Sequence, residues 1–242
     1  MRVVARAFKI VIILTLMVLS GLTGWLGLRW LWWRLTGGGT KPTPMTLPAL
    51  VRQAFEQMGP TFVKLGQVIA SSPGLFPKSF CDEFARCLDR VEPITLDEVK
   101  RTIEGELGAP VEELFADWDD QPLGSASIAQ VHAATLRDGQ RVVVKVQRSG
   151  IEEVVEADVW WMKRGARVLE ALFKGARLAN LSGVIQDFEA TIYEELDFQK
   201  EASNLREFNS IMKRHAIDDV LAPVPVDALV TKRVLVMQRL YG

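Results

Sequence analysis

The chain has 242 residues, which is room for one globular domain with additional segments. Charged residues make up 24% and hydrophobic residues 48% of the sequence, a balance that excludes a disordered polymer. Residues 1–46 contain six basic and no acidic side chains, whereas the rest contains 23 basic and 30 acidic ones. An acidic body disfavours a nucleic-acid-binding protein, which needs a basic face for phosphate contacts.

The sulfur and imidazole side chains are few and widely spaced. Cys81 and Cys87 cannot build a disulfide framework, and their spacing does not match a zinc motif. His132 and His215 lie far apart in the sequence. We therefore expect no metal site, and any chemistry must come from carboxylates, lysines and backbone groups.

The first 35 residues have the pattern of a membrane anchor. Residues 10–28 form an uncharged run that would span about 28 Å as a helix, close to the ~30 Å hydrocarbon core of a bilayer. Basic residues precede this run, and Trp30, Trp32 and Trp33 follow it. We expect an uncleaved single-pass helix. The alternative, a cleaved signal peptide, is disfavoured by the length of the run and by the lack of a small-residue cleavage site.

Residues 36–46 combine consecutive glycines with prolines and are predicted to form a linker. The sequence after the linker predicts four helices, bounded by Gly, Pro and capping residues. In the fourth helix, Thr95 and Glu98 have the spacing of a capping box. The predicted helices cover residues 45–58, 60–71, 77–89 and 95–108.

The second half of the chain predicts strands as well as helices. Two segments rich in Val, Ile and Ala, at 127–136 and 141–147, flank Asp138-Gly139, a pair typical of a hairpin turn. Two long helices and two more strands are expected after this hairpin. They cover residues 152–174, 182–213, 220–226 and 234–238. The predicted fold class is therefore α+β with an antiparallel sheet.

Two features of the hairpin region suggest anion binding. The small residues at 123–129 would let backbone N–H groups approach a phosphate, although small-residue turns before strands are common. Lys145 lies among β-branched residues, where it could point to solvent from an edge strand or hold a phosphate behind this loop. The order loop, hairpin, lysine is that of a kinase-type nucleotide lobe.

An acidic stripe is predicted on the helix 182–213. Glu194, Asp197 and Glu201 share one face of a regular helix. Glu195 lies about 160° from Asp197 on such a helix, so these two can serve one site only if the helix is irregular there. The alternative is a solvated face without a binding role.

The helix 60–71 contains Lys64-Leu65-Gly66-Gln67. Lys64 and Gln67 share a face, and a glycine inside a helix costs about 1 kcal/mol unless close packing requires it. Without further information, the polar pair could equally be a plain surface feature.

Together, these four features resemble the AarF/UbiB family of atypical kinase-like proteins, which is linked to ubiquinone and other prenyl-quinone metabolism. Residues 64–67 match the family's KxGQ motif, and residues 125–132 resemble its alanine-rich replacement for the glycine-rich loop. Lys145 matches the nucleotide-binding lysine, residues 195–197 the ExD motif, and Glu201 the glutamate that pairs with the lysine. The resemblance covers residues 47–242.

The resemblance implies a helical extension over 47–116 and a protein-kinase-like small lobe over 117–242. Lys64 is then expected to face Glu195 and Asp197 over the nucleotide cleft. The implied binding set for ATP or ADP is Ser125, Ala126, Ser127, Ile128, Ala129, Lys145, Glu201 and Met237. The implied regulatory set is Lys64, Gly66, Gln67, Glu195 and Asp197.

The end of the sequence departs from the family's pattern. Residues 234–242 resemble the last small-lobe strand and the hinge, with Gln238 where the family usually has an acidic residue. The Asp and Asn of a kinase catalytic loop and the metal-binding Asp do not follow. We therefore expect a truncated or split protein with no catalytic residue in this chain, and Mg²⁺ only together with the missing large lobe.

Two functions are compatible with these expectations. The first is the amino-terminal part of a membrane-anchored atypical kinase or ATPase-like protein that binds adenine nucleotide and supports ubiquinone, prenyl-quinone or lipid metabolism. The alternative is a non-catalytic, membrane-anchored binding or regulatory module. Expected partners are membrane lipid or prenyl-quinone and other quinone-biosynthesis proteins, without nucleic acid. The body is placed in the cytoplasm because nucleotide is supplied there.

Overall fold

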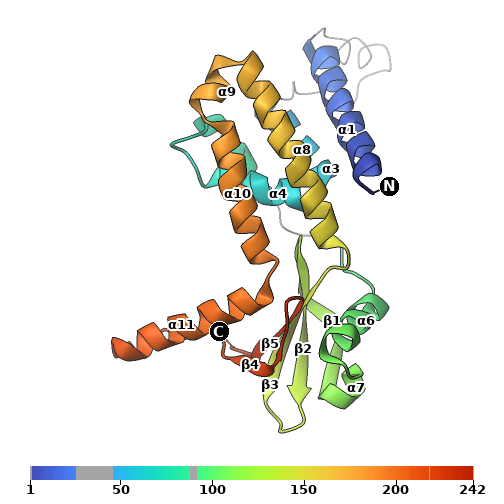
Figure 1. Cartoon of the computed structure of the whole chain (residues 1–242), viewed down its shortest axis with the longest axis vertical. Coiled ribbons are helices and arrows are strands. Elements are labelled where there is room, and N and C mark those ends of the chain that lie inside the picture. The colour runs from blue at the N-terminus through green and yellow to red at the C-terminus, as the bar shows by residue number, and fades with distance from the viewer. Residues whose placement is uncertain (1, 26–45, 88–91, 218, 242) are drawn as a thin grey trace, which may run out of the picture. The chain divides into compact units, whose positions relative to one another are not determined.

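The computed structural model describes residues 2–25, 46–87, 92–217 and 219–241. The chain forms two compact units, each assembled from two separate stretches of sequence (Figure 1). Unit 1 comprises Met1–Asp89 and Val154–Phe188, and unit 2 comprises Arg90–Glu153 and Glu189–Gly242. The domain boundaries expected from the sequence at residues 35, 46 and 116 stay predictions.

Unit 1 is helical. Its helices are α1 (Arg2–Trp25), α3 (Leu47–Met58), α4 (Pro60–Ala70), α5 (Lys78–Phe84), most of α8 (Ile151–Leu172), α9 (Lys174–Leu178) and the first half of α10 (Leu181–Glu195). The ring of Phe55 on α3 meets Phe62 and Phe84 edge-on, with ring centroids 5.5 and 5.1 Å apart. The helices predicted near α3, α4 and α8 are confirmed within two residues at each end, whereas α5 ends five residues earlier than expected.

A glycine lets α4 and α5 approach closely. Gly66 is buried inside α4, and a Cβ atom at this position would lie 2.7 Å from Cδ1 of Phe84. This contact explains why a residue with low helix propensity occupies the interior of α4. The close packing suggested by the sequence is therefore present.

Helix α1 packs against the other helices of unit 1 through one of its faces. The guanidinium of Arg6 donates to both carboxylate oxygens of Asp158 on α8, at 2.5 and 2.6 Å, and to the carbonyl of Met58 at 2.6 Å. The Asp158 side chain is fully buried, so Arg6 supplies the counter-charge that this carboxylate needs. Ile10 and Ile13 continue the same face and are buried.

Among the described residues, the membrane-spanning helix expected over residues 10–28 is not found. Helix α1 ends at Trp25, and residues 26–45, which include almost all of the expected linker, lie outside the described residues. In the part of the chain that the structure describes, no helix has both the length and the apolar character needed to cross a bilayer.

Unit 2 contains a five-stranded antiparallel sheet with the strand order β1-β2-β3-β5-β4. Its strands are β1 (Phe115–Ser125), β2 (Ala129–Leu136), β3 (Arg141–Gln147), β4 (Pro225–Val230) and β5 (Val234–Gln238). Gly139 has a positive φ of 88° in the turn between β2 and β3, as the Asp-Gly pair predicted. The α+β fold class with an antiparallel sheet is confirmed.

Two strands differ from the sequence-based expectation. Strand β1 was not predicted, because its acidic stretch around Asp117 lacks regular alternation. It is an edge strand with several register shifts, so its residues need not alternate strictly between apolar and polar. The strand expected at 220–226 instead begins at Pro225.

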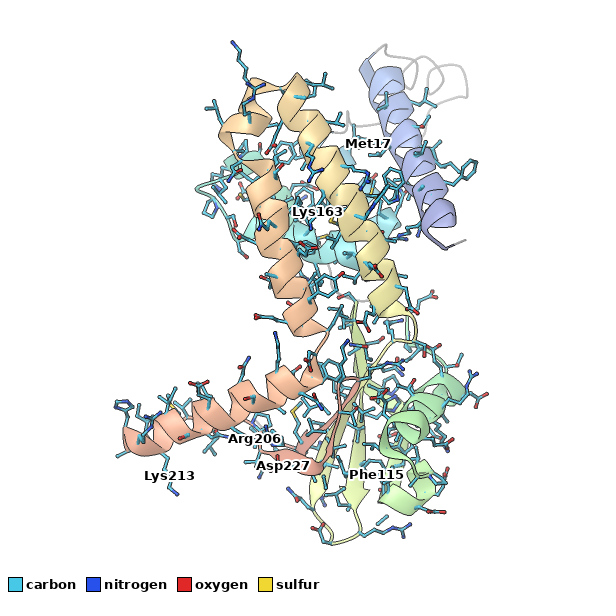
Figure 2. All side chains as sticks on the ribbon, in the orientation of Figure 1. Met17, Phe115, Lys163, Arg206, Lys213 and Asp227 are labelled. Atoms are coloured by element: carbon cyan, nitrogen blue, oxygen red, sulfur yellow. The ribbon has the colours of Figure 1, made fainter. Side chains whose placement is uncertain are left out.

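Helices cover both faces of the sheet. On one face, α6 (Leu96–Leu107) and α7 (Val111–Leu114) contribute to a buried core with Val142, Val144 and Val146 of β3. On the other face, α11 (Phe198–Arg214) packs Phe198 and Ala202 against β2 and β5. Figure 2 also shows Arg206 of α11 beside Asp227 of β4, an ion pair with a shortest distance of 2.5 Å. These two cores determine where the side chains of β3 and α11 lie.

Replacing Gly66 should destabilise unit 1. In Gly66→Ala the new methyl group overlaps the Phe84 ring, and overpacking of this kind costs about 1–3 kcal/mol of unfolding free energy. The control is Gly165→Ala on α8, where nothing lies within 4 Å of the new Cβ and the helix should gain about 0.5–1 kcal/mol. Urea unfolding of the two variants measures the difference, and equal shifts would contradict the close contact.

Candidate functional site

The acidic stripe lies at a break between two helices. The single helix expected over 182–213 is wrong, because α10 ends at Glu195 and α11 begins at Phe198. Asp197 has an extended backbone and caps α11, its Oδ1 accepting a hydrogen bond from the N–H of Gln199 at 3.0 Å. The helix is therefore interrupted between Glu195 and Asp197, which is the condition under which these two carboxylates can serve one site.

The break also divides the stripe. Glu194, on the last turn of α10, pairs with Lys200 at 3.6 Å through two well-exposed side chains. Glu201, in the first turn of α11, turns instead toward the sheet. The continuous acidic face predicted for a regular helix is thus wrong, and the carboxylates have separate partners.

Lys145 and Glu201 form the central pair of the candidate site. Lys145 Nζ lies 2.6 Å from Glu201 Oε2 and 4.7 Å from the centre of the Phe198 ring. Strand β3 lies in the middle of the sheet, so the reading of Lys145 as an edge residue is wrong. Because successive side chains alternate, Lys145 emerges on the face opposite Val144, which is the face that α11 covers. About a quarter of its side chain (26%) remains exposed.

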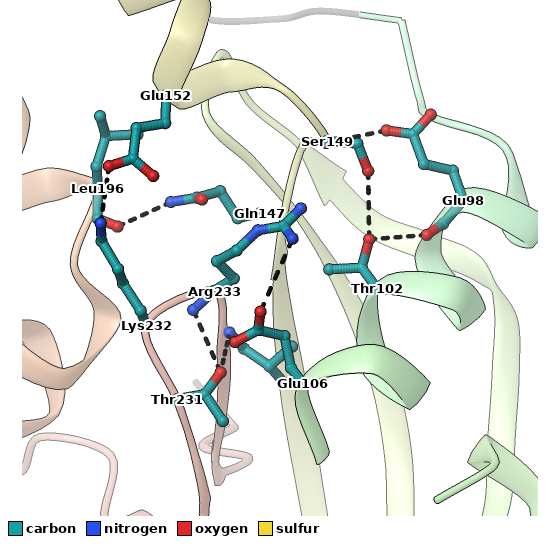
Figure 3. Close-up of polar contacts among 11 residues, drawn as sticks. Glu98, Thr102, Glu106, Gln147, Ser149, Glu152, Leu196, Thr231, Lys232 and Arg233 are labelled. Atoms are coloured by element: carbon teal, nitrogen blue, oxygen red, sulfur yellow. Dashed lines mark hydrogen bonds and ion pairs between the residues drawn. The ribbon is translucent and has the colours of Figure 1, made fainter. Parts of the chain in front are cut away.

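A buried amide holds the helix break against the sheet. Gln147 on β3 is almost fully buried, and its Nε2 donates to the carbonyl of Leu196 at 2.8 Å (Figure 3). Two residues after Leu196, the backbone N–H of Phe198 donates to the carbonyl of Lys232 at 3.1 Å. Lys232 in turn donates to Glu152 at 2.8 Å, and this hydrogen bond raises the pKa of the Lys232 ammonium. These bonds fix the first turn of α11 relative to β3.

The end of β3 is also tied to α6. Figure 3 shows Ser149 beside Glu98 and Thr102, with the N–H of Ser149 donating to the Glu98 carboxylate at 3.0 Å. Lys145 therefore lies on a strand whose continuation is held on both sides, by α6 and by the connection to α11.

The small-residue loop between β1 and β2 is folded back on itself. The N–H of Ala126 donates to the carbonyl of Ala129 at 2.8 Å. Arg148 closes the arrangement from the other side, donating to the carbonyl of Ala126 at 2.9 Å and to the Ser125 hydroxyl at 2.7 Å. Ser127 and Ile128 are buried within the loop. The loop is thus positioned by the residue that follows β3.

The structure brings several of the expected nucleotide-binding residues together. Ala129 packs in one cluster with Phe198 and Leu235, and Met237 of β5 lies against this cluster. Phe198 also lies beneath the Lys145 ammonium. The loop, Lys145, Glu201 and Met237 all belong to unit 2.

The motif residues are divided between the two units. Lys64, Gly66 and Gln67 lie on α4 in unit 1, whereas Glu195 and Asp197 belong to unit 2. The expectation that Lys64 faces the two carboxylates therefore stays a prediction. Among the residues described, no group of three or more His, Cys, Asp or Glu side chains could hold a metal ion.

Sequence reasoning missed Gln147 and Arg148. Both follow Lys145 closely, and both fix parts of the site, Gln147 the helix break and Arg148 the loop. The only available signal was a pair of polar residues at the end of an otherwise apolar strand. That signal does not indicate which distant backbone carbonyls they bind.

Comparison with known proteins identifies a family to which the sequence is similar. Residues 86–242 match the ABC1 atypical kinase-like domain. The chain is 39% identical over 197 residues to an uncharacterised chloroplastic aarF domain-containing protein kinase of Arabidopsis thaliana, covering 81% of this chain and 36% of the relative. It is 41% identical over 194 residues to a probable protein kinase UbiB of Marinobacter nauticus, covering 79% of this chain and 35% of that protein. The chain thus spans little more than a third of these relatives.

A solved structure is also similar. It is the complex of Rv3197 with erythromycin from Mycobacterium tuberculosis, which matches with a TM-score of 0.52 and 29% sequence identity. The match covers 77% of this chain and 46% of that chain. The likeness supports a kinase-like amino-terminal lobe for the sheet and its helices.

Removing the buried amide should loosen the helix break. In Gln147→Leu the buried carbonyl of Leu196 loses its hydrogen-bond donor, which costs about 1–3 kcal/mol of unfolding free energy. The matched control is Gln199→Leu, an exposed position on α11 where a change within about 0.5 kcal/mol is expected. Chemical denaturation measures both, and indistinguishable midpoints would refute a supporting role for Gln147.

Proposed function

Because the chain belongs to the family of ABC1 atypical kinase-like proteins, we propose that unit 2 binds an adenine nucleotide, ATP or ADP. The observation that carries this proposal is the 2.6 Å pair between Lys145 and Glu201, which joins the central strand to the first turn of α11. In a kinase-type lobe, a lysine held by a helix glutamate is the group that meets the nucleotide phosphates.

The residues around the pair fit a nucleotide. The Lys145 ammonium is partly exposed and can supply positive charge to phosphate oxygens, while Glu201 keeps it oriented. The alanines of the loop 125–129 permit close approach of backbone to an anion. Met237, half-buried beside Ala129, offers an apolar contact for the base. ATP would supply the transferable phosphoryl group, and Mg²⁺ would be held by the catalytic lobe of a complete kinase fold.

The wider proposal concerns the protein of which this sequence forms a part or the whole. We propose an atypical kinase or ATPase-like protein that supports ubiquinone, prenyl-quinone or lipid metabolism, with other quinone-biosynthesis proteins as partners. The relatives' names, protein kinase UbiB and aarF domain-containing protein kinase, support the kinase-like assignment.

We also propose that the amino terminus attaches the chain to a membrane, with the body in the cytoplasm. Apolar side chains exposed on α1, such as Phe8, Val11 and Leu19, support this attachment. Large apolar side chains exposed together on one helix mark an interaction surface.

Loss of the Lys145 charge should weaken nucleotide binding. Lys145→Met is expected to lower the affinity for ADP about tenfold or more, since a hydrogen bond to a charged group contributes about 1.5–3 kcal/mol. Lys100→Met is a close control. Lys100 also pairs with a glutamate at 2.6 Å in unit 2, and its side chain is 29% exposed against 26% for Lys145. Isothermal titration of both variants with ADP tests the proposal, which fails if the two affinities are equal.

The proposed contact of Lys64 with Glu195 and Asp197 predicts thermodynamic coupling. If Lys64 neutralises these carboxylates in a partly buried cleft, Lys64→Ala should cost about 3–5 kcal/mol, whereas Lys78→Ala, at an exposed pair, should cost about 1 kcal/mol or less. Glu195→Gln combined with Lys64→Ala should recover part of the loss. Small and strictly additive shifts in a urea double-mutant cycle would show that this contact does not exist.

A further inference from the structure

The end of unit 1 formed by the last turns of α8 and by α9 carries exposed apolar side chains. We define residues 163–178 as the hairpin tip, because the chain reverses there between α8 and α10 (Figure 1). Leu172, Phe173 and Leu178 are 70%, 58% and 87% exposed, and Val168 and Leu169 are also exposed. Side chains of this size at such exposure in one short segment indicate an interaction surface.

The same segment is strongly basic. It contains five basic residues and a single acidic one, Glu170, so its net charge is +4. Residues 47–242 as a whole carry −7, which leaves −11 for the body outside the hairpin tip. Positive charge is therefore concentrated at one end of unit 1, on a body that an anionic surface would otherwise repel.

The one acidic side chain of the hairpin tip is engaged in the fold. Glu170 accepts hydrogen bonds from the backbone N–H and the hydroxyl of Ser182, each at 2.7 Å, and so fastens α8 to the first turn of α10. The hydroxyl and the N–H of Ser182 hold the pKa of Glu170 below its usual value. Arg167 and Lys174 lie exposed nearby, and Figure 2 places Lys163 further back along α8.

We propose that the hairpin tip binds the surface of an anionic lipid bilayer. Leu172, Phe173 and Leu178 would enter the boundary between headgroups and acyl chains, while Arg167 and Lys174 meet the lipid phosphates. Large apolar side chains interleaved with Lys and Arg are typical of segments that lie in a membrane interface. The core of a protein–protein interface, in contrast, is depleted of lysine and other charges. The contrast between the basic hairpin tip and the acidic body also favours an anionic bilayer as the binding partner.

The hairpin tip would act beside the proposed attachment through α1. Figure 1 shows the turn between α8 and α9 at the same end of unit 1 as the carboxyl end of α1. The Arg6–Asp158 pair joins these helices within the unit. The inference rests on the proposed membrane location, and adds to it a second, charge-selective contact that orients unit 1 on the bilayer.

The test measures binding of the full chain to vesicles of phosphatidylcholine alone and to vesicles that also contain phosphatidylglycerol. The double variant Arg167→Gln with Lys174→Gln should bind the anionic vesicles about thirtyfold more weakly. This value follows from about 1 kcal/mol for each basic group near an anionic surface. Its binding to the neutral vesicles should not change. Lys213→Gln with Arg214→Gln, two exposed charges at the end of α11, is the matched control and should leave both affinities unchanged.

A second variant tests the apolar part. Leu172→Ser with Phe173→Ser should weaken binding to both kinds of vesicle, without changing the mass of the chain in sedimentation equilibrium. The proposal is overturned if the charge variant and its control lose affinity equally or not at all. It is also overturned if the serine variant changes only the oligomeric mass, which would identify the hairpin tip as a contact between copies. A wild-type chain that binds neither vesicle refutes the membrane location itself, while the ADP titration remains an independent result.

Discussion

Packing on the two faces of the unit 2 sheet brings Lys145 and Glu201 together in an ion pair, and the candidate site depends on this pair. A partly exposed pair of this kind contributes about 1 kcal/mol or less to stability, so the fold does not exist because of it. Its 2.6 Å distance is imposed by packing on the two faces of the sheet, where buried valines fix β3 from one side and Phe198 fixes α11 from the other. A charge placed by surrounding structure in this way is available for a ligand.

The helix break makes this placement possible. If α10 and α11 formed one regular helix, Glu195 and Asp197 would point in nearly opposite directions. The buried bond from Gln147 to the carbonyl of Leu196 and the cap provided by Asp197 stabilise the interruption. One short segment therefore ends a helix, starts another and presents Glu201 to Lys145.

How much of this could be predicted depends on the range of the interactions involved. Local signals were sufficient for the Asp138-Gly139 turn, for β3 and for α6, whose Thr95 cap and left-handed Gly108 act within a few residues. The helix break was not predictable from periodicity, because its hydrogen-bond donor, Gln147, lies 49 residues away. The Lys145–Glu201 pair came from resemblance to a family, since strand and helix patterns alone left Lys145 open to an edge position.

In unit 1, too, local sequence signals did not identify which residues would be in contact. The sequence suggested close packing at Gly66, but Phe84 as its neighbour depends on the path of the chain after Pro77. Hydropathy indicated an apolar helix at the amino terminus without revealing that Arg6 pairs with buried Asp158. Composition reports how apolar a segment is, whereas only the fold shows which face is already occupied.

Amide hydrogen exchange of the full chain, with and without ADP, tests the central claim most directly. Because the Lys145–Glu201 pair, the loop 125–129 and the first turn of α11 form one site in this account, ADP should slow exchange in peptides that cover these three segments together. Exchange in α6 and α7, on the opposite face of the sheet, should change least. Protection confined to α6, α7 or unit 1, or no protection at a saturating ADP concentration, would contradict the account.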